Sequence, residues 1–486
     1  MNEICFFTAK SLIYLAFDGI IYSVKLGLLY PLYDELKIKL FITVIKMKWK
    51  FILGALCMLL LTSPAVAFAN EDTYIVTLND TVSLYGLTKN DERDYTVVSS
   101  EELTEYLDAG IVVEYEPNYK VELLSENWNL DAVNCEFAWE LGCYGDEVRI
   151  GVIDSGLYPF PELEDNIIVG KNYLDGSTDT IDNIGHGTFV TGIIASKSKG
   201  ISYKSKIVPL KCFDKNKDTY VNDLLDAIYD AIDIYDCDVI NMSLGLTSDS
   251  TRLKRAITYA TNHGAIVVSA VGNDGNTTMY YPAGYDNVIG VGSVDKTFDK
   301  SWFSQNNKSV FVTAPGEELE SLSIPGYTEN AGTSFSTPHV TALAAVAKCI
   351  DKEITTEEFM DLLSVTSKDL GVVGYDNIFG YGLVDFESLI SKMLENTEVF
   401  ISPMYEENGK IFGVIYNSSD DKKDLTLINA NYNGNQFLKV NSEDVSLEPK
   451  QKYTFKNDAN GNIVKYMAWN SLNKMCPETS ARAINR

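Results

Sequence analysis

Residues 332–338 of the chain read Gly-Thr-Ser-Phe-Ser-Thr-Pro, and apolar residues follow them at helical spacing. The apolar positions are Val340, Leu343, Ala344, Ala347 and Ile350. This pattern predicts a helix that begins close to Ser334, with Pro338 in its first turn, where a missing N–H costs least. Because a helix N-terminus favours developing negative charge, Ser334 is a candidate nucleophile.

Two shorter motifs precede this serine. Ile-Asp-Ser-Gly at residues 153–156 places Asp154 at the end of an apolar strand, and Gly-His-Gly-Thr at 185–188 places His186 at the start of an apolar helix. Each motif alone is more often an ordinary turn or loop. A serine hydroxyl needs an imidazole to accept its proton, and that imidazole needs a carboxylate to hold its tautomer. The set predicts Asp154 as orienter, His186 as base and acid, and Ser334 as nucleophile.

In this order and setting, the three motifs resemble those of the subtilisin-type serine peptidases, over residues 127–394. The resemblance implies an α/β fold with a mainly parallel sheet flanked by helices, and hydrolysis of peptide bonds through an acyl-enzyme. Val-Gly-Asn-Asp-Gly at 271–275 is similar to the family segment whose asparagine donates to the oxyanion. Asn273 takes that role by resemblance, with the backbone N–H of Ser334 as second donor.

A substrate-binding segment is implied in the same way. Val-Ile-Asn-Met-Ser-Leu-Gly at 239–245 resembles the family strand that binds the substrate backbone as an added β-strand. The residues assigned to substrate binding are Ser243, Leu244, Gly245, Gly272 and Tyr280. Tyr280 stands where relatives often have glycine at the base of the pocket for the residue before the scissile bond. Either its ring narrows this pocket and favours small residues, or the ring points elsewhere.

Strand and helix patterns alternate through the central part of the chain. Strands are expected at 207–210, 239–243 and 265–270, with helices at 221–235 and 251–262 between them, a rhythm typical of a parallel sheet. Residues 126–396 are therefore expected to form the peptidase domain. Residues 397–486, with strand patterns and Asn-Gly turns at 433–434 and 460–461, are expected to form a small all-β domain.

The N-terminal part of the chain predicts a secreted precursor. Residues 47–69 have the basic start, apolar stretch and alanine-rich end of a signal peptide, with an uncleaved membrane anchor as the alternative. Residues 1–46 are then an upstream extension foreign to the native protein. Residues 70–125 resemble the small α+β propeptide of the family, which blocks the active site until it is cut, here near residues 123–127. The alternative is a subdomain that stays attached.

Composition limits the partners. With 68 acidic against 40 basic residues and a net charge of −28, the chain should repel nucleic acid and anionic membranes. We expect protein or peptide substrates, the chain's own propeptide as a partner, and a monomer. The lysine-rich stretch 196–206 lacks the acidic cluster of the calcium loop that many relatives have there.

Neither the cysteines nor the remaining histidines indicate a metal site. Six cysteines lie beyond the signal peptide without metal-ligand spacing, so no zinc and no cofactor are expected; they are Cys135, Cys143, Cys212, Cys237, Cys349 and Cys476. Secretion permits disulfides, and Cys135 and Cys143 are close enough in sequence to bridge. Cys349 is expected to be a buried thiol, His263 a helix cap and His339 a packed side chain.

Three functions remain open at this point. The first is a secreted, self-processing endopeptidase that acts through the Asp-His-Ser triad. The second is a processing peptidase of narrow specificity that matures a few extracellular proteins. The third is a catalytically silent, subtilisin-shaped binding or signalling protein, against which the intact set of Asp154, His186, Ser334 and Asn273 argues.

Overall fold

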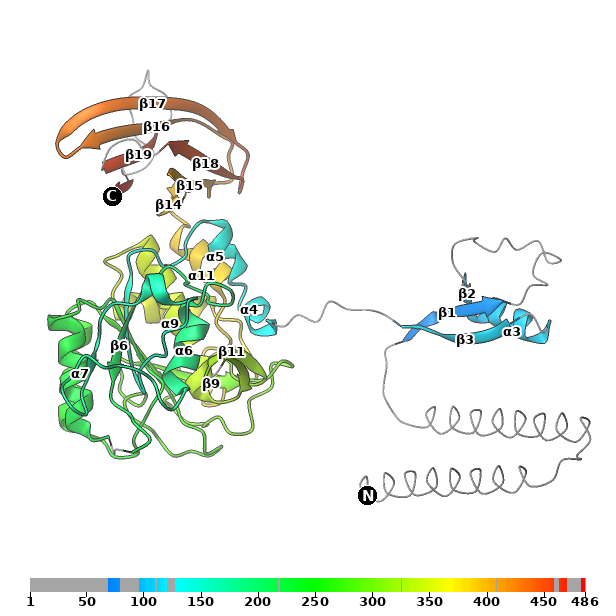
Figure 1. Ribbon diagram of the computed structural model, residues 1–486, viewed down its shortest axis with the longest axis horizontal. Helices are drawn as coiled ribbons and strands as arrows, with labels where there is room; N and C mark the ends of the chain where they lie inside the picture. The colour runs from blue at the N-terminus through cyan, green and yellow to red at the C-terminus, as the bar shows by residue number, and fades with distance from the viewer. Residues whose placement is uncertain are drawn as a thin grey trace, which may run out of the picture. The chain divides into compact units, whose positions relative to one another are not determined.

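The computed structural model describes residues 69–78, 96–109, 112–119, 127–216, 219–324, 326–407, 409–458, 463–469 and 482–485. The chain divides into two compact units, Met1–Leu124 and Ser125–Arg486 (Figure 1). The predicted upstream extension lies outside the described residues, as does all but the last residue of the predicted signal peptide. Within the described part, no helix is both long and apolar enough to span a membrane.

The first unit is a small α+β module. Its antiparallel sheet has the order β2-β1-β3, formed by Thr96–Ser99, Ala69–Leu78 and Val112–Tyr119. Helix α3 (Ser100–Asp108) begins at a reciprocal cap in which Ser99 and Glu102 each bond the other's backbone N–H. Val76, Val98 and Leu103 form a small core between sheet and helix.

The second unit is built on a seven-stranded parallel sheet of order β10-β9-β8-β7-β4-β6-β5. The strands are β4 (Arg149–Asp154), β5 (Lys171–Asn172), β6 (Lys206–Lys211), β7 (Val239–Met242), β8 (Ile266–Ala270), β9 (Ile289–Val294) and β10 (Val312–Pro315). Their residues are almost all buried, as expected when helices cover both faces of a sheet. The predicted α/β fold is thereby confirmed.

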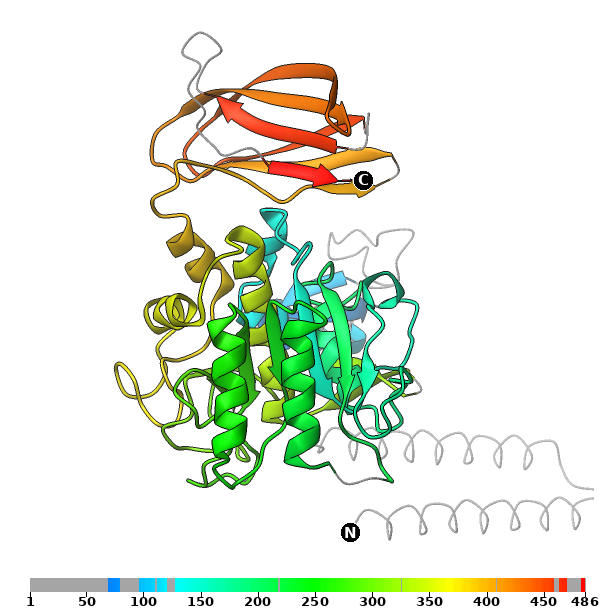
Figure 2. The same cartoon turned by 90° about the vertical axis from the view of Figure 1, so that its left-hand side faces the viewer.

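Residues of the four central strands, β4, β6, β7 and β8, enter two different cores. Val239 packs with α6 (His186–Ala195) and α9 (Thr333–Ile350), whereas Ile240 packs with α7 (Val221–Asp233) and α8 (Thr251–Asn262). The two helix pairs therefore cover opposite faces of the sheet (Figures 1 and 2). The other helical segments of this unit are α4 (Trp128–Ala132), α5 (Glu136–Glu140), η2 (Glu164–Asn166), α10 (Thr356–Thr366) and α11 (Phe386–Met393). Strands β11 (Leu319–Ser323) and β12 (Gly326–Asn330) form a hairpin.

The C-terminal part is all-β, as the sequence predicts. One antiparallel sheet contains β13 (Val399–Ile401), β15 (Lys410–Asn417), β14 (Tyr405–Glu407) and β18 (Lys452–Asp458). The other contains β17 (Gln436–Leu447), β16 (Lys423–Asn433), β19 (Ile463–Trp469) and β20 (Arg482–Asn485). Residues of both sheets share one core, including Ile411, Leu427, Phe455 and Tyr466, so the sheets form a sandwich.

The cysteines differ from one expectation. Cys135 and Cys143 are separate buried thiols rather than a disulfide, and Cys212, Cys237 and Cys349 are buried thiols too. The Cys143 thiol donates to the carbonyl of Leu141 at 3.8 Å. Burial raises the pKa of Cys135 to about 12, so its thiol stays neutral and unreactive. Cys476 lies outside the described residues.

A half-buried lysine, Lys204, links the sandwich to the peptidase part. Lys204 Nζ lies 3.0 Å from the ring centroid of Tyr405, on β14, and 4.3 Å from that of Tyr144. It also lies 3.5 Å from Asp146, whose side chain is 11% exposed. Burial raises the pKa of Asp146, and the Lys204 ammonium opposes that rise. The ammonium therefore neutralises Asp146. It also contacts the rings of Tyr144 and Tyr405, which belong to segments that are far apart in sequence.

We predict that Lys204→Ala lowers the free energy of unfolding by about 2 kcal/mol, because it leaves the Asp146 carboxyl buried without its cation. Proteolysis should then also release the sandwich more readily at the linker between α11 and β13. Lys197→Ala is the matched control, because Lys197 pairs with Asp165 at 2.7 Å with side chains 52% and 75% exposed. Equal unfolding curves for the two variants would contradict the prediction.

Candidate active site

The carboxylate of Asp154 and the imidazole of His186 form a hydrogen-bonded pair. Asp154 is the last residue of β4 and His186 the first of α6. His186 Nδ1 lies 2.8 Å from Asp154 Oδ1 and 3.0 Å from Oδ2. Since an ionised carboxylate only accepts, Nδ1 carries the proton and Nε2 keeps its lone pair. The side chains are 4% exposed for Asp154 and 31% for His186, so the base reaches solvent and its orienter does not.

Gly187 makes this close approach possible. A Cβ on Gly187 would lie 2.3 Å from the carbonyl oxygen of Gly156 and 3.1 Å from Asp154 Oδ1. The glycines of the two motifs therefore let the strand end and the helix start touch, which explains why the motifs contain them.

A second buried carboxylate, Asp182, also acts on His186, and the sequence analysis missed it. Asp182 accepts hydrogen bonds from the Thr188 hydroxyl at 2.7 Å, the Thr188 N–H at 3.0 Å and the Gly185 N–H at 2.9 Å. It therefore caps the start of α6. Burial opposes charging of His186, but the carboxylates of Asp154 and Asp182 outweigh it and raise the pKa of His186. The sequence contains one signal for this role: Asp182 is an acidic residue four positions before the histidine that opens the helix.

Ser334 lies in the first turn of α9, but Pro338 does not lie where the sequence predicted. The helix begins at Thr333, so Pro338 is its sixth residue and lies in the second turn. Having no N–H, Pro338 leaves the carbonyl of Ser334 without its helical donor. The hydroxyl of Ser243 donates to that carbonyl at 2.7 Å, and the hydroxyl of Ser334 donates to the carbonyl of Ser243 at 3.2 Å.

This pair of bonds continues into the core through Asn241, another residue that the sequence analysis did not single out. Asn241 Nδ2 donates to the Ser243 hydroxyl at 3.0 Å, and the Thr341 hydroxyl donates to Asn241 Oδ1 at 2.8 Å. Asn241 is fully buried on β7, and Thr341 lies two turns along α9. The network thus fixes the start of α9 against the end of β7.

Phe335 connects the nucleophile helix to the histidine helix. Its ring centroid lies 5.3 Å from that of His186 and 4.4 Å from that of Phe189. Phe189 is therefore an apolar contact between α6 and α9. Because Phe335 follows Ser334 directly, this contact brings the candidate nucleophile and base to adjoining helix starts.

Asn273 bonds Thr333, the residue before Ser334. Its Oδ1 accepts from the Thr333 N–H at 2.9 Å and from the Thr333 hydroxyl at 2.8 Å. These bonds orient the amide so that Nδ2 remains as the donating end. Nδ2 would lie 3.6 Å from a Cβ built on Gly332, two residues before Ser334.

The residues assigned to substrate binding lie at neighbouring strand ends. Ser243, Leu244 and Gly245 follow β7, and Gly272 follows the adjacent β8. Gly245 is exposed on the surface. The ring of Tyr280 lies against both Gly245 and Gly272, and its hydroxyl donates to Asp274 Oδ2 at 2.8 Å.

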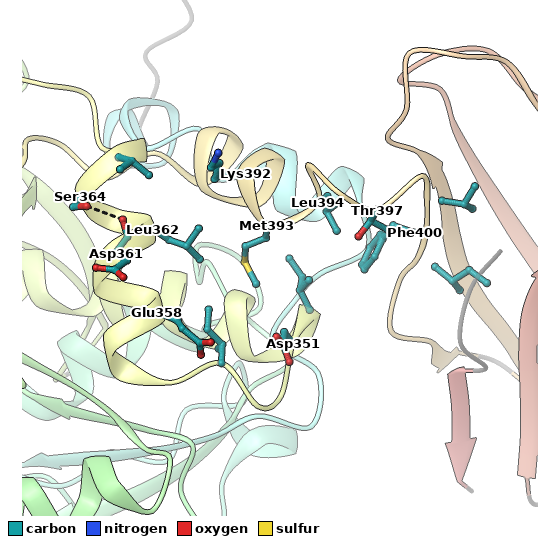
Figure 3. Close-up of a pocket in the computed structure, with 15 residues that line it drawn as sticks. Asp351, Glu358, Asp361, Leu362, Ser364, Lys392, Met393, Leu394, Thr397 and Phe400 are labelled. Carbon is teal, nitrogen blue, oxygen red and sulfur yellow. Dashed lines mark hydrogen bonds between the residues drawn. The ribbon is translucent and has the colours of Figure 1, made fainter.

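A pocket of about 900 Å³ lies elsewhere, between α10, α11 and β13. Figure 3 shows Met393 and Leu362 among its lining, with Glu358 and Lys392 nearby. It adjoins Ile350 at the far end of α9, roughly 24 Å along that helix from Ser334. The pocket is therefore separate from the candidate active site. In the described part of the chain, no group of three or more His, Cys, Asp or Glu side chains is arranged to hold a metal ion.

His339 belongs to α9 and is fully buried. Its Nδ1 donates to the Phe335 carbonyl at 3.0 Å, and its Nε2 accepts from Asn129 Nδ2 on α4 at 2.9 Å. Burial lowers the pKa of His339 to about 4. By contrast, His263 is exposed and caps the end of α8 through the Tyr259 carbonyl at 2.8 Å.

We predict that His339 weakens the protein in acid. Between its ordinary pKa of 6.5 and about 4, the unfolded chain binds a proton that the folded chain excludes, so stability falls as the pH falls. The loss should reach about 3 kcal/mol near pH 4. Urea unfolding across this pH range measures the loss of the free energy of unfolding. A Ser334→Ala background prevents autolysis during the measurement.

His339→Gln should remove this part of the pH dependence, whereas His263→Gln, at an exposed cap, should leave it unchanged. Identical pH slopes for the His339→Gln variant and its parent would show that His339 is not responsible.

Comparisons with known proteins agree with this fold. Residues 145–382 match the model of the subtilase family. The chain is 31% identical to Subtilisin BL of Lederbergia lenta over 268 residues, which are 54% of this chain and 97% of that protein. It is 35% identical to the minor extracellular protease Epr of Bacillus subtilis over 270 residues, which are 54% of this chain and 41% of Epr. The chain thus spans less than half the length of Epr.

A solved structure gives the same result. A protease from Pseudoalteromonas arctica superposes with a TM-score of 0.52 at 26% identity, over 55% of this chain and 97% of that one. Together with the match to nearly all of Subtilisin BL, this shows that the chain belongs to the subtilase family, the subtilisin-type serine peptidases.

Proposed function

We propose that this protein is an endopeptidase that hydrolyses peptide bonds with Ser334 as nucleophile, His186 as base and acid, and Asp154 as orienter. The observation that carries the proposal is the Asp154–His186 pair at 2.8 Å, whose helix packs through Phe335 against the helix start that bears Ser334. Asn273 and the Ser334 N–H are the proposed oxyanion donors.

The proposed reaction has two halves. The Ser334 hydroxyl leaves its bond to the Ser243 carbonyl and passes its proton to His186 Nε2 while Oγ attacks the peptide carbonyl. The oxyanion accepts from Asn273 Nδ2 and the Ser334 N–H, the C–N bond breaks, and His186 protonates the leaving amine. Water then attacks the acyl-enzyme with His186 again as base, which releases the acid and restores Ser334.

The substrate is proposed to bind as an extended strand. Residues 243–245 leave β7 at the end of the sheet that carries Asp154, with the Gly245 backbone exposed. Backbone hydrogen bonds to this segment would give affinity independent of side chains. The proposed partners are protein or peptide substrates.

We further propose that the protein is a secreted zymogen. The signal peptide is residues 47–69, the propeptide 70–125, the peptidase domain 126–396 and the β-sandwich 397–486, and the enzyme acts as a monomer once its own propeptide is released. The division of the chain between Leu124 and Ser125 supports a cut in this region. The likeness to Epr, a minor extracellular protease, supports secretion.

The test compares the intact masses of secreted wild-type protein and Ser334→Ala. Wild type should lose a segment that ends near residue 125, and Ser334→Ala should retain it, because removing the nucleophile should cost roughly 10⁶ in kcat. If both proteins retain the segment and the wild type cleaves no added peptide, the chain is a silent binding protein. If both lose it equally, another peptidase makes the cut.

We predict that Asn273→Ala lowers kcat roughly 10²- to 10³-fold with little change in KM, because the amide donates to charge that develops only in the transition state. Peptide hydrolysis kinetics measure this. Asn222→Ala, at an exposed position of α7, is the control and should keep full activity. Equal kcat values for the Asn273→Ala variant and wild type would remove Asn273 from the oxyanion site.

A further inference from the structure

The segments that follow β7 and β8, which contain Gly245 and Gly272, are the two walls of a space beside Ser334. The two strands are parallel neighbours, paired from Val239 with Ile266 to Met242 with Ser269. Gly245 follows the first strand and Gly272 follows the second. Gly272 precedes Asn273, and Ser243 bonds the carbonyl of Ser334 at 2.7 Å. The space between these walls therefore adjoins the proposed nucleophile and oxyanion donor.

The ring of Tyr280 occupies this space. A Cβ on Gly245 would lie 3.1 Å from Tyr280 Cδ1, and one on Gly272 would lie 2.6 Å from Cδ2. Since the two glycines meet opposite edges of the same ring, the ring stands between the walls. Gly272 also has a φ of +107°, so both its conformation and its contact with the ring require glycine.

One further contact, a hydrogen bond of the phenol, holds the ring there. Its hydroxyl donates to Asp274 Oδ2 at 2.8 Å, and this hydrogen bond raises the pKa of Tyr280. Asp274 follows Asn273 directly, so the phenol is tied to the segment that carries the proposed oxyanion donor.

The loop that leads to Tyr280 is held in place by hydrogen bonds to Gln305 and Asn307. Gln305 is fully buried, accepts from the Asn276 N–H at 2.9 Å and donates to the Thr278 carbonyl at 3.1 Å. Asn307 Nδ2 donates to the same Thr278 carbonyl at 2.8 Å. A ring held at its hydroxyl, with its backbone anchored two residues earlier, cannot leave the space without breaking these bonds.

We propose that Tyr280 closes the pocket for the residue before the scissile bond, so that the substrates are peptides with glycine, alanine or serine at that position. The proposal rests on the proposed function. A peptide that lies along residues 243–245, with its carbonyl at Ser334 and Asn273, directs this side chain between Gly245 and Gly272. Because the ring fills that space, a benzyl group has no room. This favours a peptidase of narrow specificity.

The experiment measures kcat/KM for two peptides that differ only in alanine or phenylalanine before the scissile bond. Wild type should prefer alanine by about 10²-fold, the scale on which a pocket discriminates side chains by size. Tyr280→Gly should favour phenylalanine instead. Tyr280→Phe keeps the ring but removes the hydroxyl, so it should retain the alanine preference and separates ring volume from the bond to Asp274.

The outcomes are distinguishable. A wild-type preference for phenylalanine overturns the proposal, and so does an unchanged alanine preference in Tyr280→Gly. If Tyr280→Gly does not fold, as judged by circular dichroism and cleavage of the alanine peptide, Tyr280→Ala and the wild-type profile still decide. Cleavage of both peptides by Ser334→Ala would overturn the proposed nucleophile, whereas the preferences of wild type and Tyr280→Gly decide the pocket proposal in either case.

Discussion

The carbonyl of Ser334 must find a hydrogen-bond donor outside its own helix, because Pro338 has none to offer. The Ser243 hydroxyl meets this requirement at 2.7 Å. Ser243 is held by Asn241 of β7, and Asn241 is held by Thr341 of α9, so the network begins and ends on the same helix. The requirement left by one proline therefore ties the nucleophile helix to the centre of the sheet, and the rest of the site is arranged around that connection.

Two histidines close to this helix start illustrate how surroundings set protonation. His186 faces two carboxylates, which outweigh burial and raise its pKa. His339, five residues after Ser334, is enclosed without a carboxylate partner among the bonds described, and burial lowers its pKa to about 4. The first can take up a proton during a reaction. The second stays neutral and acts as a fixed bridge between the Phe335 carbonyl and Asn129.

The sequence predicted the parallel sheet, the covering helices and the β-sandwich, because each follows from local periodicity and turn residues. It also predicted that Asp154 and His186 would pair, because an imidazole that acts as a base needs a carboxylate to hold its tautomer. What it left open depends on tertiary contacts. The direction of the Tyr280 ring is set by Asp274, Gly245 and Gly272 together, and no local pattern encodes that.

Other misses have the same origin. Pro338 was expected in the first turn, although a helix that begins beside Ser334 already puts it in the second, and the donor that compensates for it lies 91 residues away in sequence. Asp182 and Asn241 look like ordinary polar residues until their bonds to α6 and to Ser243 are visible. Cys135 and Cys143 are near in sequence, but they are buried without forming a disulfide with each other.

The bond from Asn129 to His339 also limits how short the N-terminus of the peptidase unit can become. A cut near residues 123–127 leaves Trp128 bonded to the Glu318 carbonyl at 3.3 Å and Asn129 bonded beneath the nucleophile helix. Trimming past residue 129 would leave a buried imidazole nitrogen without its donor. If the proposed cut is made, Asn129 is therefore a residue that the peptidase unit has to keep, because its loss would weaken the support of α9 beside Ser334.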